Sequence, residues 1–299
     1  DWGLWSPEGF RGWMGGLTDP ITIGVDESSR GYLPGPITPG TWQLVIGKAK
    51  LINPTVPWVA TVEFRDSATL APEERAPFDA VVLETGARWY AGDLHVHSRQ
   101  SGDATATPDE ISTLARSRGL DFVAVTDHNT ISHHALLAAA QPALDDFLFV
   151  RGVEVTTYGG HGMAISAPAY VDHRVGLDGV SATTNIDDVV AQGGVFTVNH
   201  PKLDLGDACI GCAWAHADTP WDEVSAMEII TGPYEVTGTL FTPQVIEMWD
   251  DLEDQGFQIG AIGGSDDHRA GMGTGQTESE IGSPTTEISV PVCVPRPSN

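Results

Sequence analysis

The sequence predicts an α/β protein in which a small β-sandwich-like region precedes a parallel barrel, and two observations support this. Up to about residue 88 the chain is rich in Gly, Pro and Trp, with period-two stretches at residues 41–47 and 58–64. Such a pattern is typical of short strands joined by turns. From about residue 90, apolar strands alternate with helical segments, as in parallel α/β folds. We therefore divide the chain into a β-rich region, residues 1–88, and an α/β domain, residues 89–299.

The β-rich region contains turn signals and several tryptophans. Residues 34–41 form a Gly- and Pro-rich turn cluster, and residues 67–77 have the composition of a linker or long loop. Trp2, Trp5 and Trp13 lie close to the start of the chain. They fit either a surface on which a ligand stacks or the packing of an N-terminal arm against the main domain, and we favour packing.

The α/β domain has seven expected strands and four expected helices. The first helix begins with Thr107-Pro-Asp-Glu, in which Thr107 has the position of an N-cap. Strands that alternate with helices in this way close economically into a barrel. The expected strands are residues 93–97, 122–126, 147–156, 162–166, 195–199, 226–230 and 259–263, and the expected helices are residues 107–118, 131–140, 186–192 and 243–254.

The chain is strongly acidic, because it has 15 Lys and Arg but 41 Asp and Glu, which gives a formal net charge of −26. Such a field repels nucleic acid backbones and anionic membrane surfaces, so we expect neither as a partner. An acidic chain whose lysines are only Lys48, Lys50 and Lys202 favours an exported protein, secreted or periplasmic. No apolar run is long enough to span a bilayer, and a chain that starts at Asp1 suggests that a signal peptide has been removed.

The chain has three cysteines, two of which form a Cys-x-x-Cys pair. A structural zinc site at Cys209 and Cys212 would need two more ligands nearby. We expect either a short-loop disulfide or two free thiols there, and we interpret Cys293 as structural filler.

Histidines and carboxylates follow the ends of the expected strands. His95 and His97 lie two apart in a strand and therefore point to one face, where both could bind one cation. Ionisable side chains recur at the ends of later strands, where barrel enzymes assemble their active sites. Burying so many of them is costly unless cations neutralise the carboxylates and accept the imidazole lone pairs. The later residues are Asp127, His128, Glu154, His161, His200, Asp266 and His268.

In this order, the motifs resemble those of the polymerase and histidinol phosphatase (PHP) family of metallohydrolases, over about residues 89–269. The family's usual Ser-Asp-Gly is Ser101-Gly102-Asp103 here, which shifts the acid by one place. Residues 89–98 are further similar to the carbaryl-hydrolase-like (CehA/McbA) branch, whose members often carry a β-rich region before the PHP domain. The resemblance implies a distorted (β/α)7 barrel with nine metal ligands: His95, His97, Asp103, His128, Glu154, His161, His200, Asp266 and His268.

The resemblance also implies how these residues share the ions. Two or three divalent ions are expected, and the mixture of imidazole and carboxylate ligands suits zinc, manganese or iron. Ions about 3.5 to 4 Å apart lower the pKa of a shared water and so supply a bridging hydroxide at neutral pH. His95, His97, Glu154 and Asp266 would hold one ion, Glu154 would bridge to a second held by His161 and His200, and Asp103, His128 and His268 would complete the set or hold a third.

Three further residues are candidates for catalysis. Asp127 could orient a ligand or shuttle a proton, or it could be a capping carboxylate. Arg269 could receive a substrate anion or form a surface salt bridge. His216 could face the pocket from the long loop after His200.

We expect a hydrolase that acts on a small molecule. Phosphoester hydrolysis is the first choice, because a multinuclear centre matches the charge of a phosphoryl transition state and the PHP family is rich in such enzymes. Hydrolysis of a carboxylic ester or a carbamate on the same metal centre is the alternative. A third possibility, from a different class, is a non-catalytic, metal-stabilised binding module that recognises its ligand through the aromatic N-terminal region.

Overall fold

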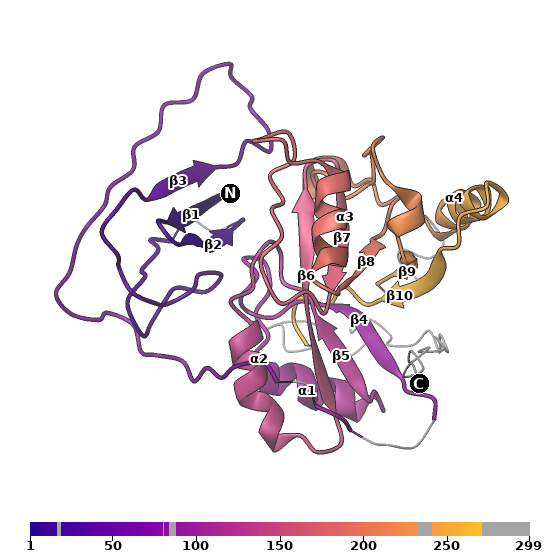
Figure 1. The fold of residues 1–299 in the computed structure, drawn as a ribbon, viewed down its shortest axis with the longest axis horizontal. Coiled ribbons are helices and arrows are strands. Elements are labelled where there is room, and N and C mark those ends of the chain that lie inside the picture. Colours follow the sequence, from indigo (N-terminus) through magenta and orange to yellow (C-terminus); the bar gives the residue numbers. More distant parts are fainter. Residues whose placement is uncertain (17–18, 80, 84–87, 233–240, 271–299) are drawn as a thin grey trace.

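The computed structural model describes residues 1–270 except 17–18, 80, 84–87 and 233–240 (Figure 1). Two predictions therefore fall partly or wholly outside the described residues: the end of the α/β domain, and Cys293. The boundary at residues 88/89 also stays a prediction.

Seven strands form one curved sheet that nearly closes into a barrel. Its order is the chain order from β4 to β10, and its two edge strands come together, because His97 N–H donates to the carbonyl of Asp267 at 2.9 Å and Asp266 N–H donates to that of His95 at 2.8 Å. The prediction of a seven-stranded α/β barrel is therefore confirmed. The strands are β4 (Gly92–Val96), β5 (Phe122–Val125), β6 (Leu148–Thr157), β7 (Gly160–Ile165), β8 (Val195–Val198), β9 (Ala226–Thr231) and β10 (Gly260–Gly264).

The sheet is mixed and not fully parallel, so that part of the prediction is wrong. β7 runs antiparallel to both β6 and β8. Only Tyr158 and Gly159 join β6 to β7, whereas a parallel connection needs a crossover of a dozen or more residues. A hairpin is the only connection that so short a link allows.

Four α-helices cover the outside of the sheet within the described residues, too few for a regular (β/α)7 barrel. α1 (Pro108–Ser117) and α2 (His134–Ala140) lie beside β5 and β6, and α3 (Ala182–Ala191) and α4 (Thr242–Asp254) lie beside β8 and β9 (Figure 1). The predicted cap of α1 is confirmed, because Thr107 and Glu110 form a reciprocal capping box. None of the described helices is both long and apolar enough to cross a membrane.

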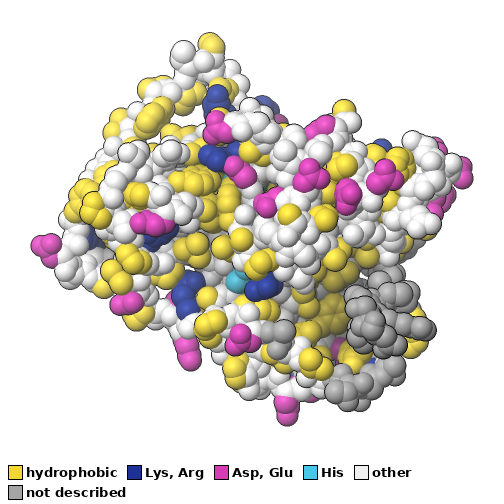
Figure 2. Space-filling model, viewed as in Figure 1, with side chains coloured by type: hydrophobic (Ala, Val, Ile, Leu, Met, Phe, Trp, Pro, Cys, Tyr) yellow, Lys and Arg dark blue, Asp and Glu magenta, His cyan; other side chains and the backbone are white. Residues whose placement is uncertain are grey.

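The N-terminal region contains one three-stranded antiparallel sheet, with the order β2-β1-β3, made of β1 (Trp2–Ser6), β2 (Gly9–Met14) and β3 (Gln43–Ile46). The described residues hold no second sheet to complete the predicted sandwich. Residues 58–64, expected as a strand, belong to no strand in the structure. Val59 is 91% and Phe64 87% exposed, so this segment lacks the packed face that its alternating pattern predicted. Its apolar side chains are part of the exposed loop in Figure 2.

Aromatic side chains pack the N-terminal sheet against the barrel. The ring of Phe10 stacks on Tyr170 with centroids 3.7 Å apart, Trp5 meets the same tyrosine edge-on at 6.1 Å, and Trp13 lies 4.3 Å from the ring of His173. Of the two interpretations of the tryptophans, the structure therefore supports packing for Trp5 and Trp13.

Candidate metal centre

The first two histidines come from the end of β4. Both side chains are fully buried, and their Nε2 atoms lie 3.1 Å apart. The pleat of the strand turns His95 and His97 to the same side, into the barrel. Nothing but a shared ligand or a proton explains two imidazole nitrogens that face each other so closely.

Glu154, in the middle of β6, stands at the centre of the histidines. Burial opposes ionisation of this carboxyl, but the charges of His128, His95 and His161 hold its pKa well below the usual range. The nitrogens 2.8 to 3.5 Å from its two oxygens belong to His95, His97, His128, His161 and His200.

Two more carboxylates close the cluster. Asp266 Oδ1 lies 3.3 Å from His95 Nε2 and 3.1 Å from His97 Nε2. Asp103 Oδ2 lies 3.4 Å from Nε2 of both His128 and His268. The structure thus brings together all nine residues that the family resemblance implied, Asp103 included.

The ligand atoms fall into three overlapping groups. Each group has its atoms within 4.8 Å of one another, which is close enough for one cation. The groups are His95, His97 and Asp266; His95, Glu154 and His200; and His97, His128 and His268.

The electrostatics of the cluster call for positive charge. Burial, followed by the charges of His268 and His128, lowers the pKa of His97 to about 3, so its lone pair is free. Burial acts the same way on His95, but Glu228, Asp266 and Glu154 raise its pKa well above the usual value. The negative charge of the carboxylates is therefore balanced either by protonated imidazoles or by cations that take the place of those protons.

Two orphaned buried atoms show that cations fit better than protons alone. Nε2 of His161 is buried without a hydrogen-bond partner among the described residues. Oε2 of Glu154 also lacks one, because its 2.8 Å contact with His128 Nδ1 is an ion-pair distance without hydrogen-bond direction. Buried polar atoms are rarely left unpaired, and the mixed nitrogen and oxygen donors suit a divalent ion.

The second ring nitrogens of three histidines are held by oxygens outside the cluster. Nδ1 of His97 lies 3.2 Å from Ser101 Oγ, and Nδ1 of His200 lies 3.2 Å from the carbonyl of Cys212. Nδ1 of His95 lies 3.2 Å from both oxygens of Glu228. Such contacts fix the ring and leave Nε2 free to bind an ion.

Sequence reasoning missed Glu228. This fully buried residue of β9 also accepts the backbone N–H of His200 at 3.2 Å. The predicted ligands follow the ends of strands, whereas Glu228 lies inside its strand, among Ala, Met and Ile. A lone carboxylate within an otherwise apolar strand is the signal that could have identified it.

Asp127 does not belong to the three groups of ligand atoms. It accepts the N–H and the hydroxyl of Ser98, both at 2.6 Å, and the hydroxyl of Ser101 at 3.1 Å, and it lies 3.0 Å from Nδ1 of His133. Burial raises its pKa to about 7. The carboxylate holds the turn that follows His97, and through Ser101 it is linked to Nδ1 of His97, so the capping and the orienting roles both stay predictions.

The other two candidates lie at the margin. The side chain of Arg269 is exposed, one residue after His268, and its backbone N–H donates to Asp267 at 2.8 Å. Nε2 of His216 lies 2.8 Å from Thr157 Oγ1, beside the turn between β6 and β7. Neither belongs to the three groups of ligand atoms, and their roles stay predictions.

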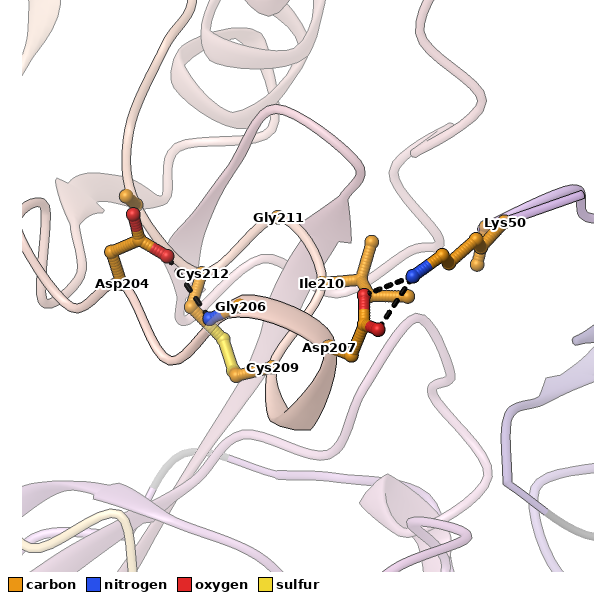
Figure 3. Close-up of a pocket in the computed structure, with 10 residues that line it drawn as sticks. Lys50, Asp204, Gly206, Asp207, Cys209, Ile210, Gly211 and Cys212 are labelled. Atoms are coloured by element: carbon orange, nitrogen blue, oxygen red, sulfur yellow. Dashed lines mark hydrogen bonds and ion pairs between the residues drawn. A yellow bond between two sulfur atoms is a disulfide. The ribbon is translucent and has the colours of Figure 1, made fainter. Parts of the chain in front are cut away.

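Cys209 and Cys212 are joined as a disulfide, the first of the two alternatives. Their loop follows His200 and lines an open pocket with Lys50, whose Nζ pairs with Asp207 at 2.6 Å (Figure 3). Because the carbonyl of Cys212 contacts His200 Nδ1, the disulfide loop is tied to the cluster.

Residues 93–178 match the family model of the PHP domain. This stretch holds the first six of the nine cluster residues, from His95 to His161. An uncharacterised protein of Methanocaldococcus jannaschii is 26% identical over 119 residues, which make up 36% of this chain and 66% of that protein.

Two solved structures are also similar. One is a two-domain protein of Bacteroides vulgatus that contains a predicted PHP-like metal-dependent phosphoesterase, at 21% identity and a TM-score of 0.46, covering 67% of this chain and 58% of that one. The other is an amidohydrolase of Chromobacterium violaceum with bound sulfate and no metal, at 18% identity and a TM-score of 0.43, covering 68% and 93%. The matches span under two thirds of the archaeal and Bacteroides proteins.

Proposed function

We propose that this protein is a metal-dependent hydrolase of phosphoesters. One observation supports this above all: nine histidines and carboxylates from distant parts of the chain meet inside the barrel, with His161 Nε2 buried and unpaired among the described residues. The PHP match over residues 93–178 points to the same part of the chain.

Two or three divalent ions, of zinc, manganese or iron, suit these donors. The three groups of ligand atoms overlap at His95 and His97, and each imidazole Nε2 binds one ion, so they are alternative sets of ligands for these ions. When bound, such ions supply Lewis acidity towards a substrate oxygen and lower the pKa of water. Glu154 joins the groups, because its Oε1 faces His95, His161 and His200 while its Oε2 faces His97 and His128.

Charge favours an anionic substrate. Burial opposes ionisation of Asp103, Glu154 and Asp266, but the surrounding imidazoles hold the pKa of each carboxyl below its usual range. With Glu228 beside His95 counted as well, two divalent ions balance the four carboxylates, and a third leaves the loaded centre with a charge of +2. In a chain of net charge −26, such a centre is a local attractor for a phosphate group, and exposed Arg269 could add to it.

A screen of aryl esters tests the substrate class. The metal-loaded protein is assayed on aryl phosphate mono-, di- and triesters, on aryl carboxylic esters and on aryl carbamates. We expect hydrolysis of the phosphates, lost in Glu154→Gln and kept in Glu247→Gln, a matched change on the exposed face of α4.

Other outcomes would replace the proposal. Turnover of carboxylic esters or carbamates alone would move the reaction to that class. If no substrate is cleaved although the protein is loaded, the protein is a binding module. That alternative has lost part of its basis, because Trp5 and Trp13 pack against the barrel.

A further inference from the structure

The loop that carries Asp103 has no regular structure of its own. It connects β4 to α1, and the side chain of Asp103 is 54% exposed. Within the barrel, a bond from Thr105 N–H to the carbonyl of His268 (2.9 Å) ties down one side of this loop. A half-exposed carboxylate on such a loop needs further support to stay between His128 and His268.

That support comes from the N-terminal region. The guanidinium of Arg30 donates to the carbonyl of Gly102 at 2.9 Å and to that of Ala104 at 3.0 Å. These are the residues directly before and after Asp103. One planar group thus holds the carbonyls of the residues on both sides of Asp103.

Neighbouring contacts hold Arg30 itself against the barrel. The backbone N–H of Gly31 donates to Gln100 Oε1 at 2.8 Å, and its carbonyl accepts from Thr130 Oγ1 at 2.8 Å. At Gly102 a side chain would collide with the backbone of Gly15. The loop is therefore enclosed between the N-terminal region and the histidines.

We propose that Arg30 is a positioning residue for the metal centre, so that the N-terminal region completes the site on the side of Asp103, His128 and His268. Asp103 matters here as a ligand of a cation, so this inference rests on the proposed function. Arginine is suited to the task because its rigid fork can bond two carbonyls at once, whereas lysine offers a single ammonium group.

Metal binding by the 299-residue chain tests this inference. Bound ions are counted by elemental analysis, and affinities are measured by competition with a zinc chelator. In Arg30→Met we expect one ion to be lost or held 10- to 100-fold more weakly, as is typical when a supporting contact of a ligand is removed. The remaining ions should bind as in the wild type. Arg30→Lys should fall between the two, and it serves as the second variant if Arg30→Met folds poorly.

A matched control and a double variant separate positioning from general stability. Arg116→Met removes a surface arginine that pairs with Asp146, and it should bind like the wild type. If Arg30 acts through Asp103, Arg30→Met should weaken binding less than twofold further in an Asp103→Asn background.

Three results would overturn the inference. Arg30→Met could bind the same number of ions, with the same affinities, as Arg116→Met. The effects of Arg30→Met and Asp103→Asn on metal affinity could multiply fully in the double variant. Alternatively, the Arg30 variants could lose all ions together, which would make Arg30 a residue that supports folding in general. A wild-type chain that binds no divalent ion would instead sink the proposed function, and this inference with it.

Discussion

Both carboxylate oxygens of Glu228 lie 3.2 Å from Nδ1 of His95, and both side chains are fully buried. β10 lies between their strands, and Gly264 in β10 leaves the room for this contact, because a Cβ there would collide with both residues. The carboxylate accepts the Nδ1–H of the ring and directs Nε2 towards Glu154 and Asp266.

Glu228→Gln should weaken metal binding by about 10- to 100-fold, since the amide keeps the shape but not the charge that makes His95 a stronger ligand. Chelator competition measures the change, and Glu247→Gln on exposed α4 is the matched control. Equal affinities in the two variants would show that Glu228 does not support the ligand.

Removing the ions should lower the unfolding temperature. Without cations, Glu154 keeps its charge buried beside imidazoles and the side-chain amide of Asn199, and Asp266 has, among the described residues, only the imidazoles of the cluster to balance its charge. Ions at a thousand times their Kd stabilise the folded state by about 4 kcal/mol. Thermal unfolding of the metal-free and the reloaded protein tests this. Reloading should raise the unfolding temperature of Glu154→Gln by less than that of the wild type. The same unfolding temperature with and without ions would contradict it.

His173 should make the protein sensitive to acid. Burial, and then the charge of Arg174, lowers its pKa to about 3, although Asp172 opposes this. Between that value and about 6.5 the unfolded chain binds the proton and the folded one does not, so stability falls as the pH falls. His173→Phe keeps an aromatic ring against Trp13. Between pH 7 and pH 5 its free energy of unfolding should fall by about 2 kcal/mol less than that of the wild type.

Urea unfolding of the metal-free proteins at both pH values measures the difference. The cluster histidines titrate equally in both proteins, so their contribution cancels. Parallel losses in wild type and variant would mean that His173 is not held neutral in the folded chain.

The disulfide should stabilise both its loop and His200. In the chain-entropy relation, closing so short a loop contributes roughly 2 kcal/mol, and the carbonyl of Cys212 holds His200 Nδ1. The double variant Cys209→Ser, Cys212→Ser should lower the unfolding free energy by that amount and weaken metal binding. Cys293→Ser, which leaves the disulfide intact, is the control. Unchanged metal affinity in the double variant would show that the disulfide loop does not support the metal ligand His200.

The strands of the barrel and the ionisable residues at their ends could be predicted because their signals are local, whereas Asp103 follows only from the family resemblance. An apolar run that ends in an ionisable residue identifies both a strand and its functional end, as for β5 and His128 or β8 and His200. The hairpin at Tyr158 and Gly159 could also have been predicted, because two residues cannot span a crossover.

Other features depend on long-range contacts that no local pattern encodes. Arg30 and Gly102 are 72 positions apart, and Glu228 becomes a partner of His95 only when the sheet curves. The alternation in residues 58–64 predicted a strand, but a strand forms only where a partner and a packed face exist.

Elemental analysis of the purified protein, combined with an aryl phosphate assay before and after chelator treatment, tests the metal centre most directly. We expect two or three equivalents of zinc, manganese or iron, loss of hydrolysis when they are removed, and recovery when they are returned. A protein that holds no divalent ion and still hydrolyses the ester in excess chelator would contradict a metal centre at His95, Glu154 and Asp266.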